Sequence, residues 1–148
     1  MSRTPLIAGN WKMFKTGREA VKSAEELAGL TKDVTHTEIM IAPAFLSIPL
    51  VTASLRDSNI SVGAQNLHFE TEGAFTGEIS ANMISDTGAE YVIIGHSERR
   101  QYFGETDENI NKKIKAAVAA GLKPILCIGE TEQDREDQKT FFILDKQV

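Results

Sequence analysis

The stretch that decides the fold is Tyr91-Val92-Ile93-Ile94-Gly95-His96-Ser97-Glu98-Arg99-Arg100, in which four apolar residues precede a glycine, a histidine and a charged run. A second stretch of the same kind is Leu6-Ile7-Ala8-Gly9-Asn10-Trp11-Lys12. Short apolar runs without alternation are typical of parallel strands that are covered on both faces. Ligands of parallel α/β folds bind at the carboxyl ends of such strands. The two stretches therefore predict a single rim that carries Lys12 and His96.

Apolar runs and helical patterns alternate along the whole chain. We expect strands near Leu6–Gly9, Glu38–Ala42, Ile60–Ala64, Tyr91–Gly95 and Pro124–Gly129. We expect helices over Glu19–Leu30 and Glu105–Ala120, with weaker ones over Leu46–Ser54 and Ala81–Thr87. The second long helix has a predicted buried stripe of Ile110, Ile114, Ala117 and Val118. Such an order predicts βαβ units in one α/β domain, spanning residues 1–148.

The C-terminal segment predicts one more helix. Thr131 has the character of an N-cap, with Asp134 three residues later. Phe141, Leu144 and Val148 then form an apolar stripe at helical spacing, which has no closing Gly, Asn or Pro. We therefore expect this chain to be part of a longer protein.

Composition excludes several classes of protein. A net charge of −5 argues against a nucleic-acid surface. The single cysteine, Cys127, excludes an internal disulfide and fits a reducing compartment, and we expect it to pack in the core. No apolar run approaches the roughly 18 residues of a membrane span, and the N-terminus does not read as a signal peptide. A cytoplasmic protein without membrane contact is the expectation.

Several types of site lack their motifs. The sequence has no G-x-G-x-x-G and no Walker lysine motif, which argues against dinucleotide and P-loop sites. One cysteine and three scattered histidines give no metal-ligand spacing, so no metal site is predicted. The G-x-S-x-G elbow of the α/β-hydrolases is also missing.

Each candidate on the rim has two interpretations from its position alone. Lys12 is a point charge for a phosphate or carboxylate, or a solvated loop lysine. Asn10 donates from its amide, or tolerates a turn. His96 is structural or catalytic, and a helical turn beginning near Ser97 would disfavour its charged form, so that the neutral ring could donate to a carbonyl. Glu98 holds Lys12 or is a surface acid.

Five motifs in order resemble the triosephosphate isomerase family. They are Gly9–Lys12, Gly63–Asn66, Gly73–Glu78, Tyr91–Arg100 and Cys127–Thr131. The resemblance implies a (β/α)8 TIM barrel, of which this chain would supply about the first five βα units. It also implies interconversion of dihydroxyacetone phosphate and glyceraldehyde 3-phosphate, without a cofactor.

The resemblance also implies roles for single residues. Asn10 and Lys12 would contact the substrate, with Lys12 offsetting its negative charge. His96 would be the neutral electrophile that stabilises the enediolate, which is the known pattern of this family. Ser97 and Glu98 would support the site.

A further set of residues is implied in a homodimer of the full-length protein. The long segment from Gln65 to Ile79 holds Phe75 between two glycines, and its Thr76 would brace Asn10 and Lys12 of the neighbouring subunit. Glu78 and Arg99 would serve the same contact.

The resemblance covers only part of a barrel that typically needs about 250 residues. The family's general base, a Glu after the sixth strand, its lid and its later phosphate loops would lie outside this chain. We therefore expect little activity from the chain alone, unless a complementary C-terminal fragment completes it. One alternative is a non-catalytic fragment or assembly module that associates through open sheet edges. Another is an unrelated phosphate-binding enzyme with a flavodoxin-like sheet.

Overall fold

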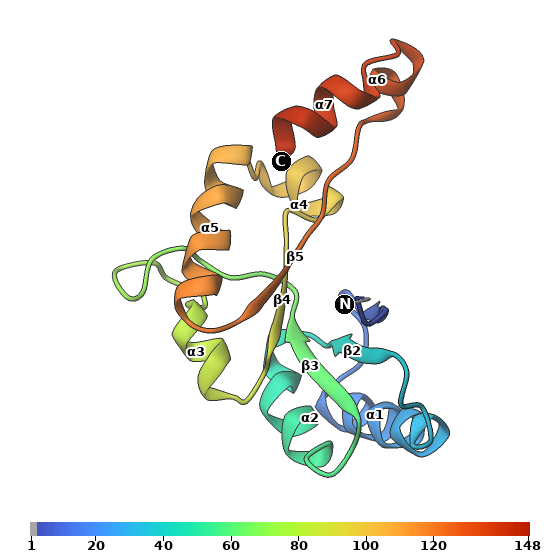
Figure 1. Cartoon of the computed structure of the whole chain (residues 1–148). Coiled ribbons are helices and arrows are strands. Elements are labelled where there is room, and N and C mark those ends of the chain that lie inside the picture. The colour runs from blue at the N-terminus through green and yellow to red at the C-terminus, as the bar shows by residue number, and fades with distance from the viewer. Residues whose placement is uncertain (1–2) are drawn as a thin grey trace.

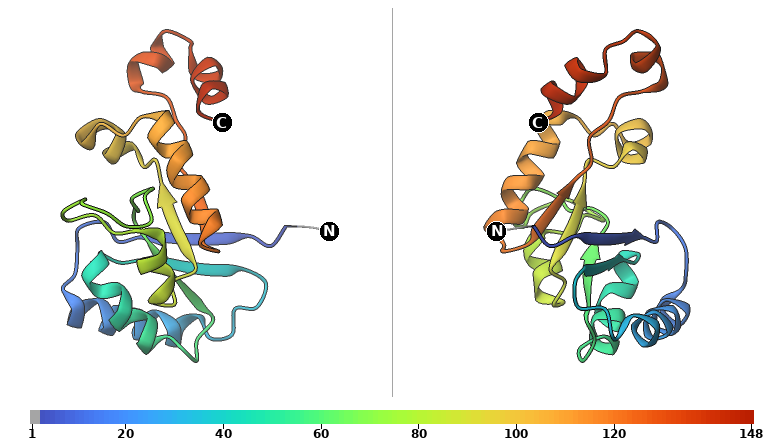
Figure 2. Two further views of the ribbon diagram at one scale, coloured as in Figure 1. Left: turned by 90° about the vertical axis from the view of Figure 1, so that its left-hand side faces the viewer. Right: turned by 45° about the vertical axis from the view of Figure 1, so that its right-hand side comes forward.

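The computed structural model describes residues 3–148, in which five parallel strands form one sheet in the order β1-β2-β3-β4-β5 (Figure 1). The strands are β1 (Leu6–Asn10), β2 (Glu38–Ala42), β3 (Ile60–Ala64), β4 (Tyr91–Ile94) and β5 (Lys123–Leu126). Their order in space is their order in the chain, and the sheet curls from β1 to β5 as half of a barrel does (Figure 2). The predicted barrel portion is thereby confirmed, and a flavodoxin-like order, in which the first strand lies inside the sheet, is excluded.

Helices cover the convex face of this sheet. The helical elements are α1 (Gly17–Thr31), a 3-10 turn η1 (Phe45–Ser47), α2 (Ile48–Ser54), α3 (Ala81–Asp86), α4 (Ser97–Phe103), α5 (Asp107–Ala119), α6 (Glu132–Glu136) and α7 (Thr140–Gln147). Local sequence fixes where they begin: Glu19 accepts a hydrogen bond from the Thr16 amide at 2.8 Å, and Thr106 accepts one from Asn109. Two small residues of α1, Ala20 and Ala24, are fully buried in the core.

The main core lies between the helices and the sheet. Its fully buried strand residues include Ile41, Val92 and Ile94, which meet apolar side chains of α1, α2, α3 and α5. A second, smaller cluster lies on the concave face, where Met40, Ala42, Tyr91 and Ile93 are buried with Ile125 and Cys127 against them. Because side chains alternate across a strand, one apolar sequence supplies both faces.

The stripe predicted on α5 needs a correction. Ile110 and Ala117 are buried, but Val118 is 60% exposed and Lys113 is only 6% exposed. Lys113 follows Ile110 by three residues and precedes Ala117 by four, so it shares their face. A charged side chain is tolerated there because it is paired, as described below.

The C-terminal segment also differs from the prediction. Strand β5 ends at Leu126, not Gly129, although the Cys127 amide still donates to the Ile94 carbonyl at 2.9 Å. Cys127 therefore lies just past the strand, half-buried against the smaller cluster.

The predicted helix start after Thr131 is confirmed, since Thr131 and Asp134 form a capping box. The single helix predicted beyond it is wrong, because Gln138 has a φ of 58° and separates α6 from α7. Phe141 and Val148 are 82% and 89% exposed, and of the predicted stripe only Leu144 is partly buried.

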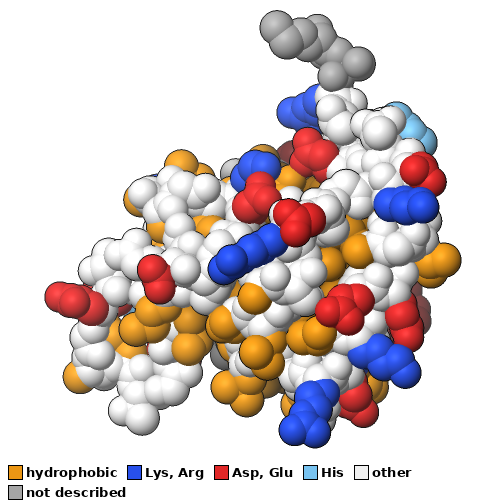
Figure 3. Space-filling model, turned by 90° about the horizontal axis from the view of Figure 1, so that it is seen from below, with side chains coloured by type: hydrophobic (Ala, Val, Ile, Leu, Met, Phe, Trp, Pro, Cys, Tyr) orange, Lys and Arg blue, Asp and Glu red, His pale blue; other side chains and the backbone are white. Residues whose placement is uncertain are grey.

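Apolar surface is exposed at both ends of the sheet. Ile7 on the edge strand β1 is 64% exposed and Ile128, after β5, is 45% exposed. Hydrophobic side chains also gather between charged ones on the face shown in Figure 3. No helix in residues 3–148 combines the length and the apolar character that crossing a bilayer requires.

Candidate functional site

The structure brings the predicted rim residues together in one pocket. The pocket has a volume of about 280 Å³ and opens at the carboxyl ends of β1, β3 and β4. The residues lining it that carry polar side chains are Asn10, Lys12, Gln65, Asn66, His96, Glu98 and Arg99. Among these, Glu98 is the only carboxylate.

Lys12 is held in an unusual backbone conformation. Its φ is 52°, in the left-handed region that non-glycine residues seldom adopt. Two side chains hold the turn: Asn10 Oδ1 accepts from the Lys12 amide at 2.9 Å, and Gln65 Nε2 donates to the Lys12 carbonyl at 2.8 Å. Gln65 also donates to the Ala42 carbonyl at 2.8 Å, which ties the turn to the end of β2. Outliers of this kind gather at functional sites.

The ammonium of Lys12 meets the carboxylate of Glu98. Nζ lies 2.5 Å from Oε1, and both side chains are a little under half exposed. The hydrogen bond from Lys12 holds the pKa of Glu98 below its ordinary value. Of the two readings left open for Glu98, partner of Lys12 or surface acid, the structure shows the first.

His96 lies between the end of β4 and the start of α4. It is the N-cap of that helix, and its Nδ1 accepts a hydrogen bond from the Glu98 amide at 3.2 Å. Glu98 Oε2 lies 3.5 Å from the same nitrogen, but that carboxylate is already paired with Lys12. With Nδ1 turned to this amide as an acceptor, Nε2 is the ring nitrogen left to donate a hydrogen bond.

Gly95 makes this arrangement possible. Its φ is 74°, and a Cβ there would lie 3.2 Å from the Cys127 carbonyl and 3.0 Å from Ile110. Arg100 closes the turn, since its Nε donates to the Gly95 carbonyl at 2.8 Å and its Nη1 binds Asp107 at 2.6 Å. The turn that delivers His96 therefore requires glycine.

Of the residues predicted for a subunit contact, Phe75, Thr76 and Glu78 lie outside this pocket, whereas Arg99 is part of its lining. Phe75 is 44% exposed and packs on His68, with ring centroids 4.4 Å apart. Thr76 and Glu78 are exposed on the same loop. Arg99 lines the pocket and pairs with Glu105 at 2.5 Å. Within residues 3–148, no hydrogen bond joins Thr76 to Asn10 or Lys12.

Two further residues of the region were missed by sequence reasoning. Glu105 and Lys113 are buried and paired with each other at 2.5 Å. The sequence pattern places Glu105 at a helix start and does not single out Lys113. A lysine at the i+3 position of a buried stripe was the available signal.

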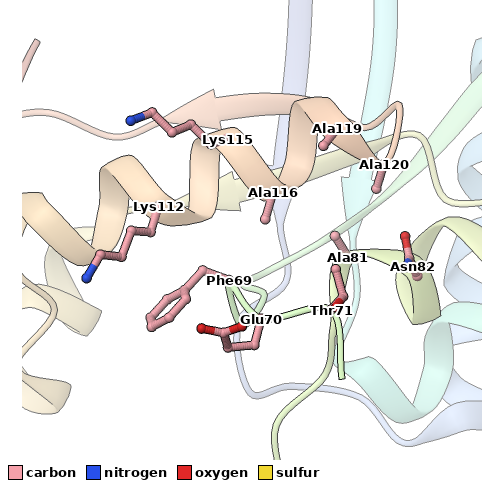
Figure 4. A pocket seen from close by; sticks show the side chains of 10 residues that line it. All are labelled: Phe69, Glu70, Thr71, Ala81, Asn82, Lys112, Lys115, Ala116, Ala119 and Ala120. Atoms are coloured by element: carbon pink, nitrogen blue, oxygen red, sulfur yellow. The ribbon is translucent and has the colours of Figure 1, made fainter. Parts of the chain in front are cut away.

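A larger hollow of about 650 Å³ lies outside the curled sheet, between α5 and the β3–α3 connection (Figure 4). Its walls include four alanines from α3 and from the C-terminal half and C-cap of α5, together with Phe69 and two lysines. It contains neither His96 nor Lys12, and one carboxylate, Glu70, borders it. Among residues 3–148 no group of three or more His, Cys, Asp or Glu side chains is placed to hold a metal ion.

Comparison with known proteins agrees with this geometry. The family model described as triosephosphate isomerase matches residues 5–148. Triosephosphate isomerases of Endomicrobium trichonymphae and Citrifermentans bemidjiense are 57% and 55% identical over 146 residues, which is 99% of this chain and 58% of each relative. The crystal structure of triosephosphate isomerase from Bartonella henselae superposes with a TM-score of 0.93 at 38% identity, covering 98% of this chain and 60% of that one.

The chain thus spans somewhat over half the length of the curated relatives that it matches. The match runs through every strand from β1 to β5 and through the Lys12 and His96 motifs. The chain belongs to the triosephosphate isomerase family.

Proposed function

We propose that the protein to which this chain corresponds interconverts dihydroxyacetone phosphate and glyceraldehyde 3-phosphate, and that residues 1–148 form an incomplete barrel domain. The observation that supports this most is the placement of His96 beside Lys12 in one pocket, with Nδ1 accepting from the Glu98 amide and Nε2 left to donate. The names of the relatives support the same substrate pair.

The reaction moves a proton from one carbon of the triose to its neighbour through an enediolate. Nε2 of His96 donates to the substrate oxygens and stabilises the charge that develops on them. Lys12 offsets the phosphate charge, and Asn10 holds the Lys12 turn and presents its amide. Ser97 and Glu98 support these groups, and Ser97 is the first residue of α4. No metal or cofactor enters this proposal.

The base that takes the carbon-bound proton has to come from outside residues 1–148. Glu98 is occupied by Lys12, and Glu130 accepts hydrogen bonds from Arg135 and Thr140. The missing groups are the general-base Glu, the lid and the later phosphate loops. A complementary C-terminal fragment would supply them, and a homodimer would add Thr76, Phe75, Glu78 and Arg99 as contacts. The proposal includes a cytoplasmic location and no nucleic-acid or membrane partner, and the −5 charge argues against nucleic acid.

A second candidate function is an assembly module without catalysis. The exposed Ile7 and Ile128 at the two ends of the sheet favour it, because such edges pair readily with other chains. Turnover separates the two candidates.

The test is isomerase turnover of the chain with and without the C-terminal part, at matched concentration and confirmed mass. We expect trace activity alone, because a placed base contributes about 10² to 10⁴-fold. In the completed protein, His96→Gln should lower turnover far more than it raises KM. Full turnover by the chain alone would overturn the assignment of the base, and none in the completed protein would favour the assembly module.

A further inference from the structure

A buried ion pair lies directly behind the proposed site. The side chains of Lys113 and Glu105 are 7% and 6% exposed, and their charged atoms lie 2.5 Å apart. Lys113 also donates to Asn66 Oδ1 at 2.8 Å, and Arg99 donates to the same Glu105 oxygen at 2.5 Å. The cluster therefore joins α5, the end of β3 and α4.

Burying these charged groups costs free energy, because they lose their hydration, and the hydrogen bonds within the cluster offset only part of that cost. Glu105 Oε1 takes both cations, whereas Oε2 is buried and accepts no hydrogen bond from residues 3–148. Burial raises the pKa of Glu105, but hydrogen bonds from Lys113 and Arg99 outweigh that effect and hold the pKa below its ordinary value. A buried ion pair is weak evidence for stability, because an apolar pair of similar size is often as stable. The role of the cluster is therefore sought in the parts of the chain that it holds in position.

The contacts form a closed circuit around the pocket. Asn66 follows Gln65, which fixes the Lys12 carbonyl. Arg99 lies three residues after His96, and the Arg99 amide donates to the His96 carbonyl at 2.8 Å. The Lys12–Glu98 pair closes the circuit on the other side. A shift of α4 would thus move His96 and the partner of Lys12 together.

We propose that Lys113 and Glu105 are positioning residues, which set α4 against the end of β3 and thereby fix the His96 ring and the Lys12–Glu98 pair. They touch no substrate. The proposal gives these residues a part in the proposed function, but it concerns the conformation of the chain itself and is tested without turnover.

The same helix offers a matched control. Lys112 and Glu108 form an ion pair 2.8 Å apart at its surface, with side chains 47% and 78% exposed. The two pairs have the same chemistry and neighbouring positions, and they differ in burial and in their link to Asn66 and Arg99. Exposed ion pairs of this kind contribute little to the stability of a fold.

The test records nitrogen NMR spectra of the His96 imidazole and hydrogen exchange of the Glu98 amide in the 148-residue chain. The variants are Lys113→Met and Glu105→Gln, with Lys112→Met and Glu108→Gln as controls. We expect Nδ1 to be an acceptor nitrogen in the parent and in both controls. Both buried-pair variants should mix the two neutral tautomers and reduce Glu98 amide protection about tenfold.

Glu105→Gln keeps the shape of the side chain, so it decides the question if Lys113→Met does not fold. Lys113→Arg, which can still pair with Glu105, should restore the parent His96 spectrum at least in part. An unchanged His96 spectrum and Glu98 protection in a folded Glu105→Gln chain would overturn the proposal. If the completed parent protein shows no turnover while the His96 spectra of the variants change as expected, only the proposed function fails.

Discussion

At the scale of single residues, Lys12 has a strained backbone conformation that neighbouring side chains hold in place. A left-handed φ of 52° costs of the order of 1–3 kcal/mol at a non-glycine residue. Asn10 and Gln65 offset this cost with hydrogen bonds to the Lys12 amide and carbonyl. The ammonium is then directed to the same pocket as His96. Such an arrangement is hard to explain for a solvated loop lysine, which needs no fixed backbone.

Lys12→Met should therefore weaken substrate binding by the completed protein without unfolding it. Loss of a hydrogen-bonded charge is worth about 1.5–3 kcal/mol, which corresponds to roughly tenfold to a hundredfold in affinity. Lys15→Met is the control, because Lys15 lies in the same loop with a φ of 70° but binds Ser23 instead. Dissociation constants for a phosphorylated substrate analogue measure the effect. Equal losses in the two variants would contradict a specific role for Lys12.

Glu105 gives a pH-dependent prediction. Its pKa is lower in the folded chain than its ordinary value of 4.5, so its contribution to folding is complete above pH 4.5 and is lost as the pH falls further. The difference in unfolding free energy between the parent and Glu105→Gln should be largest at neutral pH and shrink below pH 4.5. Urea titrations at several pH values measure it, with Glu25→Gln of α1 as an exposed control. A difference that is constant with pH would contradict the depressed value.

At the scale of elements, the turn from β4 to α4 is the most demanding segment. Gly95→Ala has to place a Cβ 3.0 Å from Ile110 and 3.2 Å from Cys127 O at a φ of 74°. Gly104→Ala, at the end of α4, has a similar φ of 65° but no atom within 4 Å of the added Cβ. We expect about 1 kcal/mol of destabilisation for Gly104→Ala from backbone strain alone, and a clearly larger loss for Gly95→Ala. Thermal unfolding of both variants decides this, and equal losses would show that the contacts around Gly95 relax freely.

Most elements could be predicted because each one has a local cause. The apolar runs at Ile60–Ala64 and Tyr91–Ile94 can be buried only as covered strands, and the two helices with the clearest stripes, α1 and α5, fall within two residues of expectation. The helix start at Thr131 could be predicted for the same reason, because its cap involves a residue only three positions away.

What could not be predicted depends on partners that are distant in sequence. Lys113 is buried because Asn66, 47 residues away, and Glu105 receive its ammonium. Gln65 reaches Lys12 over 53 residues, and its role has no local signature. The α6–α7 break at Gln138 was missed because the apolar spacing of Phe141 and Leu144 continues across it. For the site, the rim and its residue types could be predicted from the sequence, whereas the contacts that orient these residues depend on the fold.

At the scale of the whole molecule, the sheet has two ends and a partly covered concave face. The edge strands β1 and β5 each pair on one side only, with β2 and β4. Exposed Ile7 and Ile128 add apolar surface at those edges, and Phe141 and Val148 are exposed at the C-terminal end of the chain. Open parallel edges with exposed apolar side chains favour association with other chains.

We therefore expect the 148-residue chain to self-associate, and β1 and β5 amides to exchange faster than those of β3, which is paired on both sides. A complementary C-terminal fragment should bind these edges, suppress self-association and slow exchange in both edge strands, because it supplies the missing backbone partners. Ile7→Lys should reduce self-association, whereas Leu30→Lys, at a leucine of α1 that is even more exposed (84% against 64%), should not. Size-exclusion chromatography and hydrogen exchange measure all three effects. A sharp monomer peak with strongly protected edge strands, in the absence of any fragment, would show that the curled sheet is stable by itself.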